Sequence, residues 1–535
     1  MASLLMVYVL LAPIVFGALD AFSRKRWLSV VGSFSSLMAI AGLWLIKTPV
    51  VISVPYLPLS YGSQPVGLLL ASVTALVWFA ISIFSGHYLR HEQNSSRFVF
   101  MFGYSVAGAT ACFLARDFLG LFIGFELMSL ASHGLVAHDP SPVAQKAARL
   151  YHHLGNVSGV ILIVGLAALM LQIGSLDFAR LNGMPLWVAL LLSVGFAIKA
   201  GAFPIHFWLP KAHPVAPSPG SALLSGILIK TGAYGMLQVA SLTAAPKTYG
   251  LIILVVALIT MSLGVLMALI QHDAKRMLAY HSVSQMGYIL LGIGLWAFER
   301  NALGLGGAVF HMINHAVFKS ALFLICGSAL LAVNTTDIYS LGSMRKVFGL
   351  ATPLVLMPAL GIAGIPGFNG YISKTVLHSA LLGAKLSPTF ARVADLVFVL
   401  VSFGTVCSFT KFSWFVFFAD RKGERKPQHR ASKAEVIGIG ILALTALLLG
   451  VFPQPVLTAL ASGVNNLGAS WPAHLHLFDG HALEGAALTL GGGLVLYVIC
   501  YYTGVFHLHE PQIPWESLLK LINPGSRQEK AEHPR

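Results

Sequence analysis

The sequence has 535 residues, of which 56% are hydrophobic and only 10% are charged. Soluble domains carry roughly 25% charged residues, so this composition excludes an ordinary soluble enzyme and indicates an integral membrane protein. The net charge of +15 is typical of basic loops on the cytoplasmic face of a membrane, so membrane lipid rather than nucleic acid is the expected partner. The four cysteines lie far apart in apolar runs, which predicts no metal centre and no cofactor on this chain.

Apolar runs long enough to cross a bilayer, about twenty residues each, follow one another along the chain. They predict an all-α polytopic membrane protein with about fifteen transmembrane helices. The runs lie near residues 3–22, 28–46, 66–86, 98–115, 117–137, 154–174, 186–203, 219–241, 248–270, 279–298, 303–331, 350–384, 394–418, 435–452 and 482–505.

The basic residues predict the orientation of these runs. The first run is followed, not preceded, by Arg24, Lys25 and Arg26, so it predicts a first span rather than a cleaved signal. Basic residues concentrate in the loops after odd-numbered runs. This asymmetry predicts an N-terminus outside, a cytoplasmic C-terminus and a location in the inner (cytoplasmic) membrane of a bacterium.

Residues 98–241 and 248–418 each contain five runs and predict two five-helix repeats. In each repeat the fourth run is broken by proline beside a lysine, and the fifth run carries a further lysine: Pro204, Lys199 and Lys230 in the first repeat, Pro366, Lys374 and Lys411 in the second. Because five is odd, the second copy must start from the opposite side of the membrane. Inverted repeats with broken helices place an ion path near the midplane.

The rest of the chain flanks these repeats. Residues 1–97 are expected to form N-terminal transmembrane helices and 419–505 C-terminal transmembrane helices. Residues 506–535 are expected to form a cytoplasmic tail.

Ionisable residues inside the predicted spans are the main functional signal. Each costs roughly 2.5–3.5 kcal/mol at mid-bilayer on insertion scales, so such groups persist where they face a wet or polar interior. We therefore predict a proton or ion path. The candidate residues are Glu126, Lys199, Lys230, His311, His315, Lys319, Lys374 and Lys411.

Structural interpretations of the same residues remain open. Lys411 lies near the cytoplasmic end of its run and could extend to the interface. Glu126 could belong to a buried salt bridge, and the proline breaks could be packing kinks. If Glu126 and Lys199 approach each other in the fold, movement of the carboxylate could change the protonation of the amine, which is the physical basis of a charge-relay pump.

Three residues of one run, His311, His315 and Lys319, recur at i, i+4 steps and share one helical face. Histidine titrates near neutrality and can pass protons in either direction. The spacing also resembles a bis-histidine haem or metal site. That interpretation is weaker, because a lysine one turn further along would repel a cation.

Several long segments resemble the antiporter-like subunits of respiratory complex I and the Mrp sodium/proton antiporters. The segments are AIKAGAFPIHFWLPKAHPVAPSPGSALLSGILIKTGAYG, QHDAKRMLAYHSVSQMGYILLGIG, HMINHAVFKSALFLICGS and GIPGFNGYISKTVL. Together they extend the resemblance over about residues 65–420. It implies an inverted five-helix repeat and a line of charges parallel to the membrane.

The resemblance also implies roles for individual residues. Glu126 matches the family's helix-five glutamate, Lys199 its helix-seven lysine and Lys230 its helix-eight basic residue. His311, His315 and Lys319 match the helix-eleven group, and Lys374 matches the lysine of broken helix twelve. Where some members carry an arginine–aspartate gate, this sequence reads His153-Leu154-Gly155-Asn156, so His153 is the possible gate.

Within the superfamily, the sequence is most similar to the DabB branch. That resemblance implies a hetero-oligomer with a soluble zinc-binding DabA-like protein, in which cation flow drives CO2/bicarbonate accumulation. The interpretation rests on the short tail, the many histidines and the expectation that no lateral helix is present. The alternatives are a proton-pumping subunit of a complex I-like or membrane hydrogenase complex, and a Mrp-type antiporter subunit. In each case the chain is a transporter subunit and not itself an enzyme.

Overall fold

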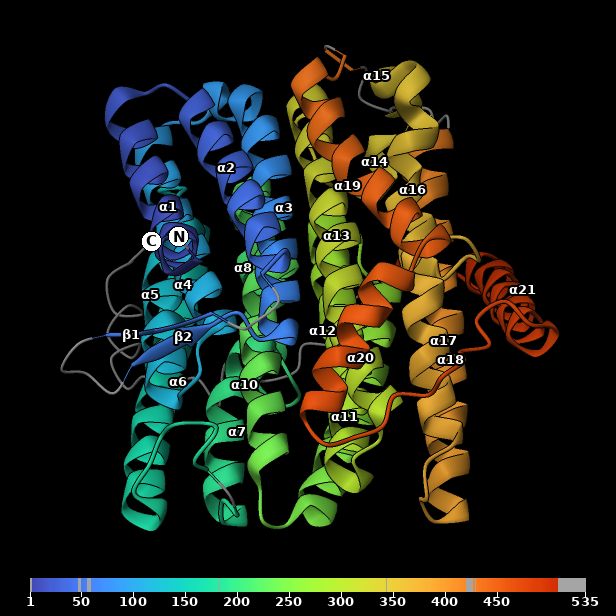
Figure 1. The fold of residues 1–535 in the computed structure, drawn as a ribbon. Coiled ribbons are helices and arrows are strands. Elements are labelled where there is room, and N and C mark those ends of the chain that lie inside the picture. Colours follow the sequence, from blue (N-terminus) through green and yellow to red (C-terminus); the bar gives the residue numbers. More distant parts are fainter. Residues whose placement is uncertain are drawn as a thin grey trace, which may run out of the picture.

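The computed structural model describes residues 2–46, 50–54, 59–181, 183–342, 344–419, 427–428 and 430–508. Within these ranges the chain is a bundle of long helices with one small β-hairpin (Figure 1). Most of the expected tail, from residue 509 onward, lies outside the described residues.

The N-terminal part holds three long helices and the hairpin. Strand β1 pairs antiparallel with β2, and Val51 lies opposite Gly62. Pro65 begins the third helix, where its missing N–H leaves no intrahelical bond unmade. The elements are α1 Ala2–Ser23, α2 Trp27–Trp44, β1 Val51–Ser53, β2 Ser60–Gly62, α3 Pro65–Tyr88 and η1 Leu89–His91.

The first five-helix repeat lies to the left in Figure 1. Its fourth span is interrupted between α7 and α8, and its fifth contains a π-helical turn, η3. The elements are α4 Ser95–Leu114, α5 Phe118–Val136, α6 Pro142–Ile173, α7 Leu186–Ala200, η2 His206–Trp208, α8 Leu209–Val215, α9 Ser218–Leu223, η3 Leu224–Leu228 and α10 Ile229–Leu242.

The second repeat lies to the right in Figure 1 and follows the same plan. Its fourth span is broken between α16 and α17, and its fifth ends in a π-helical turn, η5. The elements are α11 Pro246–Leu269, α12 Ala274–Glu299, α13 Ala302–Val333, α14 Ile338–Leu341, α15 Met344–Phe348, η4 Gly349–Ala351, α16 Thr352–Ala363, α17 Asn369–Leu382, α18 Pro388–Ser413 and η5 Trp414–Phe418.

A matched pair of short β-bridges shows the correspondence between the repeats. Asp117 caps the start of α5 by accepting from the Gly120 amide and bridges to Asp177 after α6. In the second repeat Asp273 caps α12 by accepting from the Arg276 amide, and it bridges to Asp337 after α13. Both copies therefore tie the start of their second helix to the end of their third.

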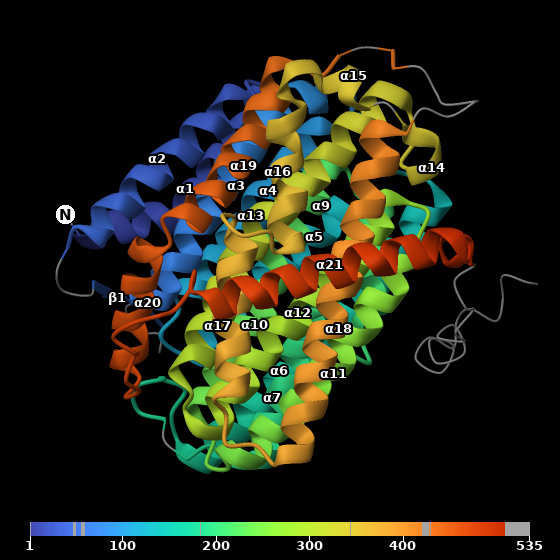
Figure 2. The same ribbon diagram turned by 90° about the vertical axis from the view of Figure 1, so that its right-hand side faces the viewer.

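The C-terminal elements cover the second repeat. They are α19 Lys433–Val451, α20 Gln454–Asn466, α21 Gly480–Tyr502 and η6 Val505–His507. Helix α21 runs across the outer face of α18 instead of alongside it (Figure 2). Its contact is made by small residues, since a Cβ on Gly493 would lie 2.4 Å from the Cβ of Val406.

Thirteen helices within the described ranges are long and apolar enough to cross a membrane. The shorter α7 and the more polar α12 complete the fifteen predicted runs, so the all-α polytopic fold class is confirmed. The course of α21 corrects one expectation. The last run is a membrane-length helix, but it lies laterally on the bundle (Figure 2), whereas the sequence analysis expected no lateral helix. Hydropathy predicts that a helix lies in the membrane, but it does not predict whether the helix crosses the membrane or lies along it.

Candidate functional site

The break after α7 places Lys199 in the last turn of that helix. The helix ends at Ala200, and the indole nitrogen of Trp208 donates to the freed carbonyl of Ile198 at 2.8 Å. Lys199 is only 4% exposed. The C-terminal end of a helix carries partial negative charge, which favours a cation there.

Tyr151 on α6 is the direct partner of Lys199. The amine donates to its phenol oxygen at 2.7 Å and lies 4.5 Å from its ring centroid. The same phenol oxygen is 2.5 Å from Ser132 Oγ. A very small pocket, lined by Phe125, Ser129, Tyr151, Trp208 and others, adjoins the amine. Lys199 thus faces a small polar recess in an apolar core.

Glu126 on α5 lies within electrostatic reach of Lys199 without pairing to it. Among the described residues it makes no ion pair within 4 Å, and its Oε1 is buried without a hydrogen-bond partner. A Cβ on Gly159 of α6 would lie 2.8 Å from that oxygen. The carboxylate therefore fits into space left by a glycine, and the buried salt bridge considered above is not formed in this conformation.

Lys230 follows the π-helical turn in the fifth span. It is 1% exposed and donates to the carbonyl of Ser225, five residues earlier, within that turn. Ser225 Oγ lies 2.7 Å from Ser282 Oγ on α12. The turn therefore fixes the amine and connects the first repeat to the second.

The titratable residues of α13 are fully buried. His311 contacts Ser373 Oγ at 2.9 Å through Nδ1 and Gln285 Oε1 at 3.1 Å through Nε2. Lys319 donates to the carbonyl of Leu278 at 2.6 Å. Both ring nitrogens of His315 lack a partner in the described part of the chain, so water is needed to satisfy them.

The break between α16 and α17 holds Lys374. Its amine donates to the carbonyl of Ile362 at 3.0 Å, just before the break. It also lies 5.5 Å from the ring centroid of Tyr288, whose ring is 5.7 Å from that of His311. Lys374 and the α13 histidines therefore line one region of the second repeat.

Lys411 does not extend to the interface. It is 0% exposed and donates to the carbonyls of Leu269 and Gln271 at 2.9 and 2.7 Å. These carbonyls lie at and just beyond the C-terminal end of α11. A similar contact joins Lys275 to the carbonyls of Pro214 and Ala216, beside the break between α8 and α9.

Two further histidines were quoted in the family segments but not assigned a role. His213 on α8 and His281 on α12 are 0% exposed, and neither ring makes a hydrogen bond among the described residues. His213 lies in electrostatic reach of Lys230 and Lys319, and His281 in reach of Lys319 and Lys411. Each histidine therefore has at least two lysine amines in its surroundings. In the sequence, each is only a single histidine within an apolar segment, and this pattern alone does not predict a functional residue.

The possible gate residue lies at the surface of the bundle. His153 is exposed. The adjacent His152 contacts Asn156 at 3.2 Å, and its ring centroid lies 4.8 Å from that of His133 on α5. The role of His153 stays a prediction, and His152 is the residue that faces α5.

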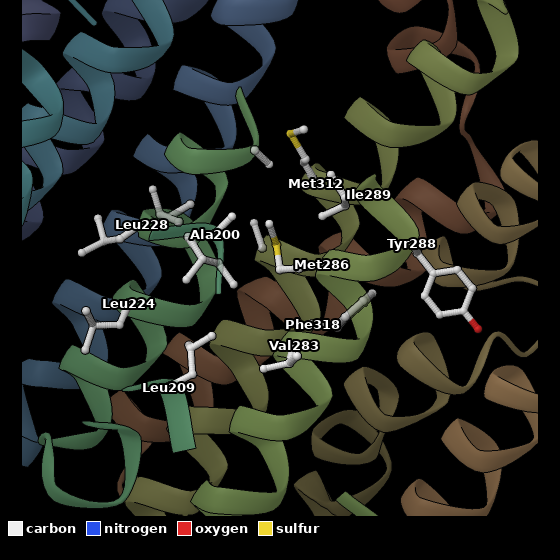
Figure 3. Close-up of a cluster of buried hydrophobic side chains, with 14 of the residues drawn as sticks. Ala200, Leu209, Leu224, Leu228, Val283, Met286, Tyr288, Ile289, Met312 and Phe318 are labelled. Carbon is white, nitrogen blue, oxygen red and sulfur yellow. The ribbon is translucent and has the colours of Figure 1, made fainter. Parts of the chain in front are cut away.

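Apolar side chains from both repeats pack around these groups (Figure 3). Ala200, Leu224 and Leu228 lie on the first-repeat side, and Val283, Met286 and Met312 on the second-repeat side. The polar residues therefore lie within a largely apolar core and connect to one another through the contacts described above.

A family model described as NADH:quinone oxidoreductase/Mrp antiporter, TM matches residues 115–400. The chain belongs to this family. The matched range contains the candidate residues from Glu126 to Lys374, whereas Lys411 lies just beyond it.

Curated relatives extend the similarity to most of the chain. Hydrogenase-4 component B of Escherichia coli is 31% identical over 81% of this chain, which spans 66% of that relative, slightly less than two thirds. A Na(+)/H(+) antiporter subunit of Alkalihalophilus pseudofirmus is 28% identical over 84% of this chain and 94% of its own length.

Solved structures share the fold. A chain of the membrane-bound sulfane sulfur reductase, an archaeal respiratory membrane complex, is 26% identical and superposes with a TM-score of 0.77 over 94% of this chain and 85% of its own. A chain of the Mrp complex from Dietzia sp. DQ12-45-1b gives the same TM-score at 23% identity, over 92% of this chain and 99% of its own. Members of the NADH:quinone oxidoreductase/Mrp antiporter family thus build this helical arrangement in multi-subunit complexes.

Proposed function

We propose that this protein is the cation-translocating subunit of a multi-subunit membrane complex and that it moves protons along its buried charged residues. One observation carries the proposal: Lys199 is buried, and the half-buried Glu126 lies within electrostatic reach of it with one oxygen buried and unpaired, while Lys199 is held by Tyr151. Burying two opposite charges without pairing them is costly. We therefore infer that this conformation, with the carboxylate and the amine apart, is one state of a cycle, and that the two groups pair in another state.

The proposed cycle alternates between these two arrangements. When Glu126 swings towards Lys199, its negative charge favours the protonated amine; when it swings away, the amine loses that support and releases its proton. Lys230 then passes protons from the first repeat to Lys319 and Lys374 in the second, with the buried histidines and water between them.

The chemistry of the side chains favours protons over sodium. The candidate path consists of amines and imidazoles with a single carboxylate, Glu126. A sodium ion requires several oxygen ligands, and ammonium groups repel it. Imidazoles and amines, in contrast, take up and release protons directly.

The test is proton movement by the intact complex in proteoliposomes. Glu126→Gln and Lys199→Ala are each expected to abolish coupled proton transport while the complex still assembles. Lys247→Ala, which alters an exposed lysine at the start of α11, is the control and should transport normally. Full transport by either Glu126→Gln or Lys199→Ala would falsify the proposal.

The partner is the finer part of the proposal. The similarity to the DabB branch favours a soluble zinc-binding DabA-like partner and a role in CO2/bicarbonate accumulation. Relatives are named as hydrogenase and antiporter subunits, which supports a redox complex or a Mrp-type antiporter instead. Purification of the native complex distinguishes these alternatives. A co-purified zinc-bearing soluble protein supports the DabA-like partner. Iron–sulfur subunits support a redox complex, and several small membrane proteins support a Mrp-type antiporter. The lateral course of α21 removes one argument for the DabB branch.

A further inference from the structure

Lys411 lies in a cluster of aromatic and titratable side chains at one end of the second repeat. Its amine is 5.4 Å from the ring centroid of Tyr339 on α14 and 4.9 Å from that of Phe506 in η6. It also donates to the carbonyl of Gln271, which directly precedes His272 in the connection between α11 and α12. Three segments that are far apart in the sequence therefore meet at this amine.

Two histidines belong to this cluster. The ring centroid of His272 lies 5.1 Å from that of Tyr339 and 6.3 Å from that of His507. The rings of His507 and Tyr339 are 5.3 Å apart. His507 is exposed and His272 is partly exposed, whereas Lys411 is completely buried. The cluster therefore places two solvent-accessible imidazoles beside a buried amine.

The η6 turn is fixed in this position by its own contacts. The hydroxyl of Tyr339 donates to the carbonyl of Phe506 at 3.0 Å. The Phe506 side chain is buried in a small apolar cluster with Leu269 at the end of α11, Cys407 of α18 and Cys500 of α21. Because η6 directly follows α21, the lateral helix ends where the Lys411 amine is covered.

The groups that face His272 favour its neutral form. Burial and then the positive charge of Lys411 lower the pKa of His272, which lies outside the membrane-spanning helices. His507 acts in the same direction, whereas the Phe506 backbone and Asp337, which precedes α14, partly offset the effect. An imidazole that is mostly neutral can accept a proton and pass it on without retaining it.

Lys411 also connects inwards to the candidate path. His281 of α12 has both Lys411 and Lys319 in electrostatic reach. Its ring centroid lies 4.8 Å from that of Phe409 on α18, and the Lys319 amine lies 5.9 Å from the same phenylalanine ring. His281 is fully buried without a hydrogen bond among the described residues, so water is needed to satisfy it. Titratable groups therefore lead from Lys411 through His281 to Lys319.

We propose that His272 and His507 form a proton port, the place where the path exchanges protons with water through Lys411. The port rests on the proton translocation proposed above and adds the residues at which the path ends. Lys275 and Arg276 follow in the same connection, so the positive-inside rule predicts that the port faces the cytoplasm. In the inward direction, the imidazole takes a proton from water and gives it to the neutral amine, which returns the imidazole to its neutral form.

The test is chemical rescue of proton transport by the intact complex in proteoliposomes. His272→Ala/His507→Ala should lower transport by about 100-fold, the lower end of the typical range for a positioned proton-transfer group. Added imidazole should restore most of the rate in this variant and leave the wild type unchanged, because it replaces the missing side chains. His481→Ala, which removes an exposed histidine at the start of α21, is the matched control and should transport normally without imidazole.

Normal transport by the double variant, or a loss that imidazole does not restore, would overturn the port. If the alanine variant does not assemble, His272→Gln/His507→Gln keeps polar side chains of similar size and should show the same loss and the same rescue. Glu126→Gln, measured in parallel, distinguishes the two proposals. It stays inactive with or without imidazole if only the port is wrong, whereas full transport by Glu126→Gln rejects the path itself.

Discussion

The amines of Lys230, Lys374 and Lys411 donate to backbone carbonyls at a π-turn, a helix break and a helix end. An amine donates N–H groups whether or not it carries its third proton, so these contacts persist when the lysine is neutral. The side chain therefore keeps its position while its charge changes. A carboxylate partner would instead hold the proton in place, since an adjacent opposite charge favours the charged form.

Gly159 sets the position of Glu126. We expect Gly159→Ala to displace the carboxylate, because the new Cβ would lie 2.8 Å from Oε1, and to lower proton transport by about tenfold or more, which corresponds to about 1.4 kcal/mol in the barrier. Alanine favours a helix over glycine by roughly 0.5–1 kcal/mol, so the melting temperature should not fall. Transport assays and thermal unfolding of the same preparation check both parts.

The control for this prediction is Gly491→Ala on α21, which gains helix propensity without touching the path. It should transport at the wild-type rate. Normal transport by Gly159→Ala would show that the position of Glu126 is not set by this contact.

The sequence predicted that the candidate amines are buried, which the structure shows, but it did not predict their partners. A lysine inside an apolar run is conspicuous, because so few charged residues belong there. The carbonyls that accept from Lys374 and Lys411 depend on where helices break and end, and on which helices pack together. His213 and His281 were missed for a related reason: a neutral histidine costs little in an apolar stretch, so only its buried location among amines marks it.

Among the elements, α21 departs most from expectation. It is apolar along its length, and only Ala486, Gly493 and Cys500 are buried, at seven-residue intervals. This stripe of small residues lets α21 lie close across α18 (Figure 2). The same hydropathy would suit a spanning helix, so only the packing against α18 determines its direction.

The attachment of α21 can be monitored with native cysteines. Cys407 on α18 and Cys500 on α21 are free cysteines of one small buried cluster, so oxidation should connect the two helices. Gly493→Leu would place a Cβ 2.4 Å from Val406, and such overpacking typically costs about 1–3 kcal/mol. We expect the yield of the crosslink, measured by mass spectrometry of proteolytic peptides, to fall sharply.

Gly491→Leu points away from α18 and should crosslink as the wild type does. An unchanged yield in Gly493→Leu would mean that α21 is held by contacts other than this stripe.

At the scale of the whole molecule, the two repeats share their construction and the positions of two lysines, but not their other titratable residues. Asp117 and Asp273 occupy matching positions as helix caps and bridge residues. The carboxylate of the path, Glu126, belongs to the first repeat alone, whereas the buried α13 histidines belong to the second. The fold is thus repeated, whereas the set of charged residues differs between the two copies.

The shared construction predicts equal structural roles for the two aspartates. Asp117→Ala and Asp273→Ala each remove a helix cap, which costs about 1–2 kcal/mol. We expect similar falls in melting temperature, measured by calorimetry of the purified protein. A large effect in one variant and none in the other would contradict the equivalence of the repeats.

The lateral helix gives the molecule two unlike edges. On one edge α21 lies across α18 (Figure 2), whereas on another α6 exposes Val160, Ile163 and Val164 along its length. Copies packed side by side in a membrane would therefore meet through two unlike surfaces, because reversing one copy would bring two α21 helices into contact. The shape of each copy then determines which of its surfaces receives the next neighbour.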